Sequence, residues 1–360
     1  MNDQSRRRVL ITGGGGFIGR HLVNGFADRG FAVTVLDFSG EGPERDDVAL
    51  VQADIRDKHA VMQACTGMDT VVHNASLVHT RQNQADAVRQ VNYDGTLHVM
   101  EACLAAGVQR LVYISSASAV YEGEDIENGD ESLPYSATSQ APYADSKIIA
   151  EKAVLEFDGT GCTRTCAIRP HVVFGPGDTR FMPAILEKAE KGLLKRAVGN
   201  RDKLSDFTYI DNLVDAVLAA EENLVPDSPV CGQAYFVTNG EPMAFFDFVE
   251  KVVVALGYPP IKGRVPYWLA WTVAAVAEGL DALRGKSPGA ESGMTRFAMR
   301  YMVTHHYYSI ARAREDLGWI PRVDLEEGIR RTVAALDRAG HGLPQSGRMD
   351  EGPGTVVPQT

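Results

Sequence analysis

The chain has few cysteines, a deficit of positive charge and no clear set of metal ligands. Its 360 residues include five cysteines, and 47 acidic residues against 36 lysines and arginines give a formal net charge of −11. An acidic chain has no attraction for a phosphate backbone, which argues against nucleic acid as a partner. Cys162 and Cys166 have no second Cys or His pair to complete a zinc-type set. We expect free thiols in a reducing compartment and no metal.

Long apolar segments are also missing. No apolar stretch follows the basic start of the chain, so we expect no secretory signal and a cytoplasmic protein. The longest nearly unbroken apolar run covers residues 265–277, whereas a membrane span needs ~20 residues. This run carries Trp268 and Trp271 and predicts a cover for an apolar ligand. Core packing and peripheral contact with a membrane are the alternatives.

The sequence does contain a regular alternation of short apolar stretches and helical ones. Hydrophobic residues recur at helical spacing in residues 17–26, 87–106 and 146–156. Strand-like runs occupy residues 9–12, 32–36, 49–51, 70–73, 111–115 and 166–168. This alternation predicts an α/β fold, with a Rossmann-type, doubly wound parallel sheet.

The pattern loosens beyond about residue 175. The Gly-Pro-Gly-Asp segment at residues 175–178 predicts a loop, and a helix is expected over residues 183–191. We expect residues 1–175 to form mainly the Rossmann domain. Residues 176–339 are expected to form mainly a smaller C-terminal substrate-binding lobe, with some segments returning to the Rossmann core. Residues 340–360 are rich in Gly, Pro and polar residues and predict a disordered tail.

A glycine-rich turn at residues 12–19 joins the first predicted strand to the first predicted helix. Gly13 permits the tight turn, Gly16 lets the backbone approach a pyrophosphate, and Gly19 lets helix and strand pack closely. The N–H groups at the start of the helix, near Phe17 and Ile18, and its positive dipole end then face the phosphates. This context predicts dinucleotide binding rather than a plain turn.

Acidic residues follow the next two predicted strands. Asp37 ends the second strand, where a carboxylate accepts hydrogen bonds from the ribose 2′-OH and repels a 2′-phosphate. No arginine follows it closely, so NAD is favoured over NADP. Asp54 and Ile55 follow the third strand and are candidates for contact with the adenine, with a turn as the alternative role for the pair.

Tyr143 and Lys147 are spaced to share one face of a helix. Free tyrosine titrates near ~10, too high for a base at neutral pH, but a lysine ammonium one turn away favours the phenolate. The pair therefore predicts a group that accepts an alcohol proton as hydride leaves for NAD⁺. Ser116, at the end of a strand-like run, is the candidate to hold the substrate oxygen, and Ser118 is the alternative.

Together the glycine turn, the Tyr-x-x-x-Lys pair and the upstream serine resemble the extended short-chain dehydrogenases/reductases. Other blocks are similar to the 3β-hydroxysteroid dehydrogenase/isomerase family within that group, and closest to its sterol-4α-carboxylate 3-dehydrogenase (decarboxylating) branch. These blocks are residues 115–135, 167–171, 174–176, 206–212 and 306–309. The likeness covers roughly residues 8–335.

The resemblance implies roles for particular residues. It implies Ser116, Tyr143 and Lys147 as the catalytic set, and Asn92 as the asparagine that supports the lysine through water. It also implies that Asn74, Ala75, Ser76 and Pro170 line the cofactor site. Family members often pair through the helices that carry Asn92 and Tyr143, so a homodimer is implied.

Three classes of function remain open at this point. The first is NAD-dependent oxidation of a 3β-hydroxyl on a sterol or steroid, with decarboxylation of a 4α-carboxylate or, as a close variant, reduction of long-chain 2-alkyl-3-oxo acids. The second is a nucleotide-sugar epimerase or dehydratase, which would need cations such as Arg196 and Arg201 for a diphosphate. The third is a non-catalytic NAD-binding protein. The apolar run near Trp268 favours a small apolar alcohol or ketone as the substrate.

Overall fold

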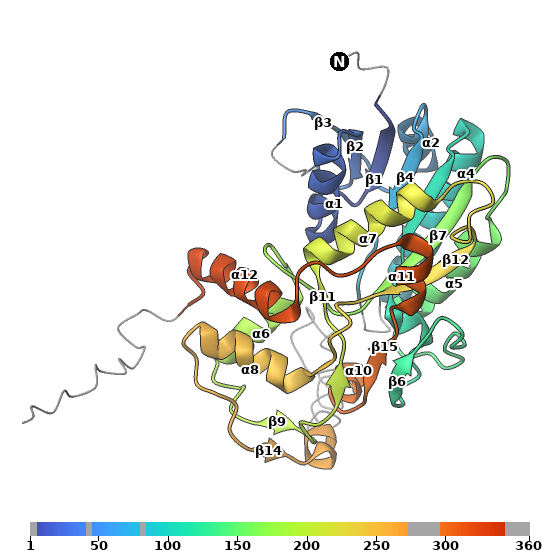
Figure 1. Cartoon of the computed structure of the whole chain (residues 1–360). Helices are drawn as coiled ribbons and strands as arrows, with labels where there is room; N and C mark the ends of the chain where they lie inside the picture. The colour runs from blue at the N-terminus through green and yellow to red at the C-terminus, as the bar shows by residue number, and fades with distance from the viewer. Residues whose placement is uncertain (1–5, 41–44, 80–83, 273–295, 343–360) are drawn as a thin grey trace, which may run out of the picture.

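The computed structural model describes residues 6–40, 45–79, 84–272 and 296–342. A large sheet with helices on both faces forms one part of the molecule, and a smaller lobe lies beside it (Figure 1). The predicted tail from residue 343 onward lies outside the described residues. So does the apolar run from residue 273 onward.

The described residues build a seven-stranded parallel sheet with the order β12-β7-β5-β4-β1-β2-β3. The chain runs outward from β1 to β3 and returns through β4, so the direction of winding changes between β1 and β4. This confirms the doubly wound Rossmann-type sheet. The strands are β1 (Arg8–Thr12), β2 (Ala32–Asp37), β3 (Val48–Gln52), β4 (Thr70–His73), β5 (Arg110–Ile114), β7 (Arg164–Pro170) and β12 (Gln233–Val237).

Both faces of this sheet are buried because its strands are apolar at successive positions. In β1, Val9 and Ile11 belong to the hydrophobic cluster on one face, and Leu10 belongs to the cluster on the other. Helices α1 (Phe17–Asp28) and α7 (Ile210–Asn223) pack together over the first face. Over the second face lie α2 (Lys58–Cys65), α4 (Gly95–Ala106) and α5 (Pro142–Glu156).

The helix predicted over residues 87–106 is interrupted. It consists of α3 (Ala85–Arg89), a π-helical turn at Gln90–Asp94 and then α4. The π turn contains the buried Asn92, whose side chain bonds the backbone of Leu77 and the hydroxyl of Ser146. A π turn adds a residue to a helix, and such bulges are frequent at functional sites.

The smaller lobe is built from short elements. Its four-stranded sheet has the order β13-β10-β15-β6, and two further strand pairs are β11 with β8 and β14 with β9. The strands are β6 (Ile126–Gly129), β8 (Val173–Phe174), β9 (Ala197–Val198), β10 (Leu204–Ser205), β11 (Thr208–Tyr209), β13 (Met243–Ala244), β14 (Arg264–Val265) and β15 (His306–Tyr308). The helices are α6 (Phe181–Glu190), α8 (Phe245–Ala255), α10 (Arg296–Tyr301) and α12 (Leu325–Arg338), whereas α11 (Ala311–Leu317) packs against α7 and β12 beside the parallel sheet.

Segments from each half of the chain enter the other part. Strand β12 and helix α7 follow residue 176, yet they complete the parallel sheet and one of its covers. Strand β6 precedes residue 176 but pairs with β15 in the lobe. Among the described helices, none combines the length and the apolar composition that crossing a membrane requires.

Candidate active site

The carboxyl ends of β1, β2, β4, β5 and β7 surround a cavity of about 770 Å³. This is the edge where ligands bind in open α/β sheets, at the point where the winding reverses. Two of the predicted site residues, Gly19 and Asn92, do not line it. The predicted residues that do are Gly13, Gly16, Phe17, Ile18, Asp37, Asp54, Ile55, Asn74, Ala75, Ser76, Ser116, Tyr143, Lys147 and Pro170.

Each glycine of the turn has a different steric role. Gly13 has φ +69°, and its N–H donates to the carbonyl of Leu36 at 2.8 Å. A Cβ on Gly19 would lie 2.0 Å from the Gly13 carbonyl oxygen, so this residue packs helix α1 against the turn. A Cβ on Gly16 would meet only that oxygen, at 3.5 Å, and would otherwise project into open space. Gly16 therefore leaves room for a ligand beside the start of α1.

The carboxylate of Asp37 lies at the cavity wall and holds the glycine turn in place. It accepts the N–H of Gly15 at 2.9 Å, the N–H of Ser39 at 3.0 Å and the Ser39 hydroxyl at 2.7 Å. The neighbouring wall residue Asp54 binds Arg56 at 2.6 Å, which lowers the pKa of Asp54. Asp37 thus combines a structural role with exposure to the cavity.

The segment directly after β4 is hydrogen-bonded to the glycine-rich turn at residues 12–19. Its backbone at Ala75 donates to the Thr12 hydroxyl at 3.1 Å, and the Asn74 side-chain amide donates to the Gly13 carbonyl at 3.2 Å. The Ser76 hydroxyl is buried, lines the cavity and has no hydrogen-bond partner among the described residues. A buried polar atom without a partner is costly, so Ser76 fits a polar ligand group at this wall.

Ser116, Tyr143 and Lys147 converge on the wall nearest the ends of β5 and α5. The Tyr143 hydroxyl is hydrogen-bonded to Ser116, and the Lys147 ammonium donates to the Ile114 carbonyl at 2.6 Å. The ammonium lies 5.8 Å from the centre of the Tyr143 ring. The helical spacing therefore brings the two side chains to the same wall, as the sequence predicted.

Burial controls the acidity of both groups. It raises the pKa of Tyr143 to about 12, against the opposing effects of the Ser116 hydrogen bond and the Arg180 charge. Burial also lowers the pKa of Lys147 to about 7, while Glu151 acts in the opposite direction. The sequence argument assigned the lowering of the tyrosine pKa to Lys147. Among the protein's own groups, Ser116 and Arg180 have that effect.

The two candidate serines have different positions. Ser116 lines the cavity, whereas Ser118 is buried behind it and does not. The Ser118 hydroxyl donates to the Ser116 hydroxyl oxygen at 2.9 Å, and the Ser118 N–H donates to the same oxygen at 3.1 Å. This geometry supports Ser116 as the residue that faces the substrate, with Ser118 fixing its rotamer.

The predicted supporting residue Asn92 lies behind the wall. Its side-chain oxygen accepts the N–H of Leu77 at 2.6 Å, and its amide donates to the Leu77 carbonyl at 3.0 Å and to the Ser146 hydroxyl at 2.9 Å. Asn92 thus joins the π turn to helix α5 next to Lys147. Its role toward the lysine stays a prediction.

The opposite wall of the cavity contains Asp178 and Arg180, which the sequence motifs did not predict as site residues. Asp178 accepts the N–H groups of Arg180 at 2.7 Å and of Met182 at 2.9 Å, and so caps helix α6, which begins at Phe181. The predicted start at Pro183 was two residues late. An Asx cap directly after Gly-Pro-Gly was the available signal. The cap brings Arg180 to the cavity, where it also donates to the Val78 carbonyl at 2.9 Å.

Several residues weighed for other roles lie elsewhere. Trp268 and Trp271 are exposed and do not line the cavity, so they do not cover a ligand there. Arg201 binds Asp247 and Glu250, which leaves it engaged within the lobe. Neither Arg201 nor Arg196 lines the cavity, so no diphosphate site is formed there by these cations.

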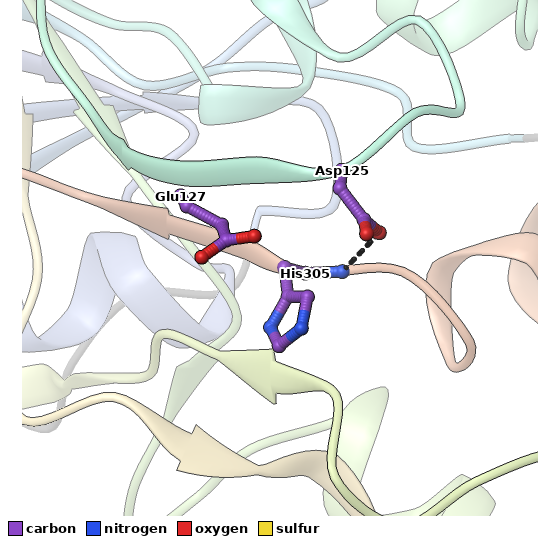
Figure 2. A group of neighbouring side chains, drawn as sticks. All are labelled: Asp125, Glu127 and His305. Carbon is purple, nitrogen blue, oxygen red and sulfur yellow. Dashed lines mark hydrogen bonds between the residues drawn. The ribbon is translucent and has the colours of Figure 1, made fainter.

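One group of side chains in the smaller lobe has donor types that suit a metal. Asp125, Glu127 and His305 offer ligand atoms within 4.8 Å of one another (Figure 2). However, Asp125 is paired with Lys203 at 2.6 Å and accepts the backbone N–H of His305 at 2.9 Å. The charge of Asp125 is therefore compensated within the protein, and we assign no metal to this group.

Comparison with known proteins finds a family profile and relatives that are all named as dehydrogenases or reductases. Residues 10–266 match the profile of the 3-beta hydroxysteroid dehydrogenase/isomerase family. The chain is 36% identical over 337 residues to sterol-4-alpha-carboxylate 3-dehydrogenase, decarboxylating, of Mus musculus, covering 93% of this chain and 92% of that protein. It is 37% identical over 335 residues to 2-alkyl-3-oxoalkanoate reductase of Stenotrophomonas maltophilia, covering 91% of this chain and 99% of that protein.

Solved structures share the fold. UDP-glucose 4-epimerase of Thermus thermophilus, in complex with NAD, superposes with a TM-score of 0.70 at 25% identity and covers 92% of this chain and 99% of that chain. The structure of gox2253 superposes with a TM-score of 0.76 at 22% identity, covering 94% of this chain and 100% of that chain. Similarity at this level describes the architecture.

Proposed function

Since the chain belongs to the 3-beta hydroxysteroid dehydrogenase/isomerase family, we propose that it oxidises the 3β-hydroxyl group of a sterol-like alcohol, with NAD as its cofactor. It is an oxidoreductase that acts on CH–OH groups. The observation that carries the proposal is the convergence of Ser116, Tyr143 and Lys147 on one wall of the cavity that begins at the glycine turn.

The residues around the turn suit NAD. The free space beside Gly16 accommodates the pyrophosphate, and Asp37 is available to the adenosine ribose. The partnerless hydroxyl of Ser76 fits a further polar group of the cofactor. The negative charge of Asp37 opposes a 2′-phosphate, which supports NAD over NADP.

The protein's own groups handle the proton. Ser116 holds the substrate oxygen, and Tyr143 accepts the alcohol proton through its hydrogen-bonded hydroxyl. When bound, NAD⁺ would supply the acceptor for the hydride of the carbinol carbon and a positive charge that favours the tyrosinate. Lys147 is held by the Ile114 carbonyl beside this pair, and with a pKa of about 7 it can be charged or neutral near neutral pH.

The names of two relatives point to a shared substrate feature. One acts on a sterol 4-carboxylate at carbon 3, and the other reduces a 2-alkyl-3-oxoalkanoate. In both, the reacting carbon is attached to the carbon that bears the carboxylate. Oxidation of such a hydroxy acid gives a β-keto acid. Its carbon–carboxylate bond then breaks, CO₂ leaves, and the electron pair forms an enolate that takes up a proton.

A substrate screen tests the proposal. The enzyme should form NADH from NAD⁺ with a 3β-hydroxysteroid or a 4α-carboxysterol, and mass spectrometry should show loss of CO₂ from the carboxysterol. Tyr143→Phe is the matched inactive control. No NADH from any sterol, together with interconversion of UDP-sugars without added NAD⁺, would refute the proposal in favour of an epimerase.

The second candidate is reduction of 2-alkyl-3-oxo acids. Its support is the 37% identity to a reductase of that name, which the chain matches over 99% of its length. The same three residues would then return a proton to the carbonyl oxygen, and the high pKa of Tyr143 suits a proton donor. Consumption of NADH with a long-chain 2-alkyl-3-oxo acid, and no reaction with sterols, would select this candidate.

A further inference from the structure

Val172 has an unusual backbone conformation at the wall of the cavity. Its φ is +38°, in the left-handed region that a side chain branched at Cβ normally avoids. It follows β7 closely and lines the cavity together with Pro170, the last residue of that strand. A strained residue persists only where its surroundings hold it, and such residues cluster at functional sites. The fold around Val172 must therefore hold it in place.

The main chain at Val172 is bonded to Thr208 of β11. The His171 N–H donates to the Thr208 hydroxyl oxygen at 3.2 Å, and that hydroxyl donates to the His171 carbonyl at 2.7 Å. The Thr208 N–H donates to the Val172 carbonyl at 3.2 Å. These bonds attach residues 171–172 to the pair formed by β8 and β11. The side chain of His171 adds a second attachment.

His171, His306 and Tyr301 form a buried set of hydrogen bonds, which we call the polar triad. His306 Nε2 faces the main-chain carbonyl of Tyr301, which can only accept, so Nε2 carries a proton. Burial lowers the pKa of His306 to about 4 and that of His171 well below its usual value, so both rings are neutral at pH 7. His306 Nδ1 then accepts from His171 Nε2 at 2.7 Å, and His171 Nδ1 accepts the Tyr301 hydroxyl at 2.9 Å.

The polar triad leaves the His171 ring one orientation. Both nitrogens of that ring are engaged, and His171 and His306 are only 2% and 0% exposed. The Tyr301 ring stacks on His306 with ring centres 4.1 Å apart and meets His171 edge-on at 5.3 Å. Turning the His171 ring would leave buried polar groups without partners, which is costly. The triad thus fastens the end of β7 to α10 and β15 (Figure 1).

Val172 lies toward the reacting end of the cavity. Strand β7 is the neighbour of β5, and Ser116 follows β5. The Ser115 N–H donates to the Ile168 carbonyl at 2.8 Å, so the end of β7 runs beside the segment that leads into Ser116. Hydride transfer requires the nicotinamide of NAD near Ser116 and Tyr143. The wall at Val172 is therefore available to that part of the cofactor.

We propose that His171, His306 and Tyr301 are positioning residues, which hold Val172 in the strained conformation that the nicotinamide end of NAD requires. This inference rests on the proposed function, because the place of the nicotinamide follows from the hydride step. The alternative is a triad that only stabilises the fold. The two roles differ in the ligand that they affect, since ADP-ribose is the part of NAD that lacks nicotinamide.

Tyr301→Phe tests the positioning role because it removes one hydroxyl and keeps the ring. The Kd for NAD⁺, measured by calorimetry, should rise by at least about tenfold once the strain at Val172 can relax. The Kd for ADP-ribose should stay within about twofold of the wild type. Tyr235→Phe is the matched control, because its buried hydroxyl donates to Asp316 at 2.9 Å and does not contact the triad. It should leave both affinities unchanged.

Substitution of Val172 tests the strain itself. In the Tyr301→Phe background, Val172→Gly should recover most of the NAD⁺ affinity, because glycine adopts positive φ without a steric cost. Val172→Ala removes nearly the same side chain but keeps the Cβ, so it should recover much less. In the wild-type background, Val172→Gly should melt at a higher temperature than Val172→Ala. This comparison holds even if Tyr301→Phe does not fold.

Each outcome decides the matter in one direction. Equal weakening of NAD⁺ and ADP-ribose by Tyr301→Phe, or weakening of neither, would overturn the proposal. So would equal recovery by Val172→Gly and Val172→Ala, or a lower melting temperature for the glycine variant. Failure of the wild type to bind NAD⁺ would refute the proposed function and this inference together. Normal NAD⁺ binding by the wild type, with no selective loss in the variant, would refute this inference alone.

Discussion

At the residue scale, the state of Tyr143 depends on a competition between burial and nearby charge. Burial favours the neutral phenol, whereas the Ser116 hydrogen bond and the Arg180 guanidinium favour the phenolate. Burial lowers the pKa of Lys147 to about 7, so its charge changes over the pH range in which enzymes are assayed. The pH dependence of turnover therefore reports on several wall residues together.

Tyr143→Phe removes the group that we assign to the alcohol proton. General acid–base catalysis typically contributes ~10²–10⁴-fold, so kcat should fall by at least about a hundredfold. NAD⁺ affinity, measured by fluorescence titration, should remain within a few-fold of the wild type. Ser116→Ala should reduce kcat more than Ser118→Ala, because Ser118 acts only through Ser116. Near-normal turnover by Tyr143→Phe would refute the assignment of the alcohol proton to Tyr143.

Arg180→Gln should shift the pH profile of oxidation. The Arg180 charge lowers the pKa of Tyr143, so its loss raises that pKa. The rise of kcat with pH, which follows formation of the tyrosinate, should then occur at higher pH. Arg56→Gln is the matched control, because Arg56 lines the same cavity but is paired with Asp54. A profile that moves equally in both variants would argue against the assigned effect.

Asp37 variants separate charge from structure. Asp37→Asn keeps oxygen and amide groups near Gly15 and Ser39 but removes the repulsion of a 2′-phosphate. It should narrow the ratio of kcat/KM for NAD⁺ over NADP⁺ by at least tenfold. Asp37→Ala should in addition weaken NAD⁺ binding, since the turn loses its anchor. A wild-type enzyme that uses NADP⁺ as well as NAD⁺ would contradict the assignment.

At the element scale, the local signals predicted more of the parallel sheet than of the lobe. Strands β1, β2 and β4 were predicted closely because each is short, rich in β-branched residues and mostly buried. Helix α5 was predicted from Ser146 but begins at Pro142, so that Tyr143 lies in its first turn. The catalytic pair remained correct because its spacing, not the helix boundary, carried the signal.

The smaller lobe was harder to predict from the sequence because its elements depend on partners that are distant along the chain. Strands β9 and β14 have two residues each and form only because they pair with one another. The π turn at Asn92 depends on contacts with Leu77 and Ser146, which the sequence does not reveal. Arg180 likewise reaches the cavity only through the cap that Asp178 gives to α6.

Helix α5 is held by a buried ion pair. Glu151, one turn after Lys147, binds Arg169 of β7 at 2.6 Å, and both side chains are almost fully buried. Glu151→Gln leaves the guanidinium without its counter-charge and should lower the free energy of unfolding by about 3–5 kcal/mol. It should also lower the pKa of Lys147 further, because the Glu151 charge raises it.

Urea denaturation measures the first effect and the pH profile of kcat the second. Glu156→Gln, at the exposed end of the same helix, is the control and should change stability by less than about 0.5 kcal/mol. Equal stability of Glu151→Gln and Glu156→Gln would show that the buried pair does not support α5.

At the scale of the whole molecule, buried polar groups add to the apolar packing within the sheet part and within the lobe. Glu221 of α7 accepts the Thr70 hydroxyl at 2.8 Å and binds Arg7 at 3.0 Å, which fastens the helix to the amino ends of the central strands β4 and β1. In the lobe, His171 bonds His306 at 2.7 Å and the Tyr301 hydroxyl at 2.9 Å. The predicted homodimer, through the helices of Asn92 and Tyr143, stays a prediction.

The buried histidines make the protein sensitive to acid. Burial lowers the pKa of His73 from 6.5 to about 3 and of His306 from 6.5 to about 4, and it lowers that of His171 well below 6.5. These side chains stay neutral in the folded protein at pH 5, whereas the unfolded chain protonates them near pH 6.5. The unfolded state then binds more protons, so the free energy of unfolding decreases as pH falls from about 7 toward 4.

The expected loss is large enough to measure. At pH 5 His73 and His306 each cost about 2 kcal/mol relative to pH 7, and His171 acts in the same direction. Asp206, whose pKa is raised to about 7 by burial, acts in the opposite sense because the folded form takes up its proton first. Urea denaturation should therefore show a net decrease of a few kcal/mol between pH 7 and pH 5. His171→Gln should reduce this decrease in the free energy of unfolding. His59→Gln, which changes an exposed histidine, should leave the decrease unchanged. Equal stability at the two pH values would show that the histidines are not neutral in the folded protein.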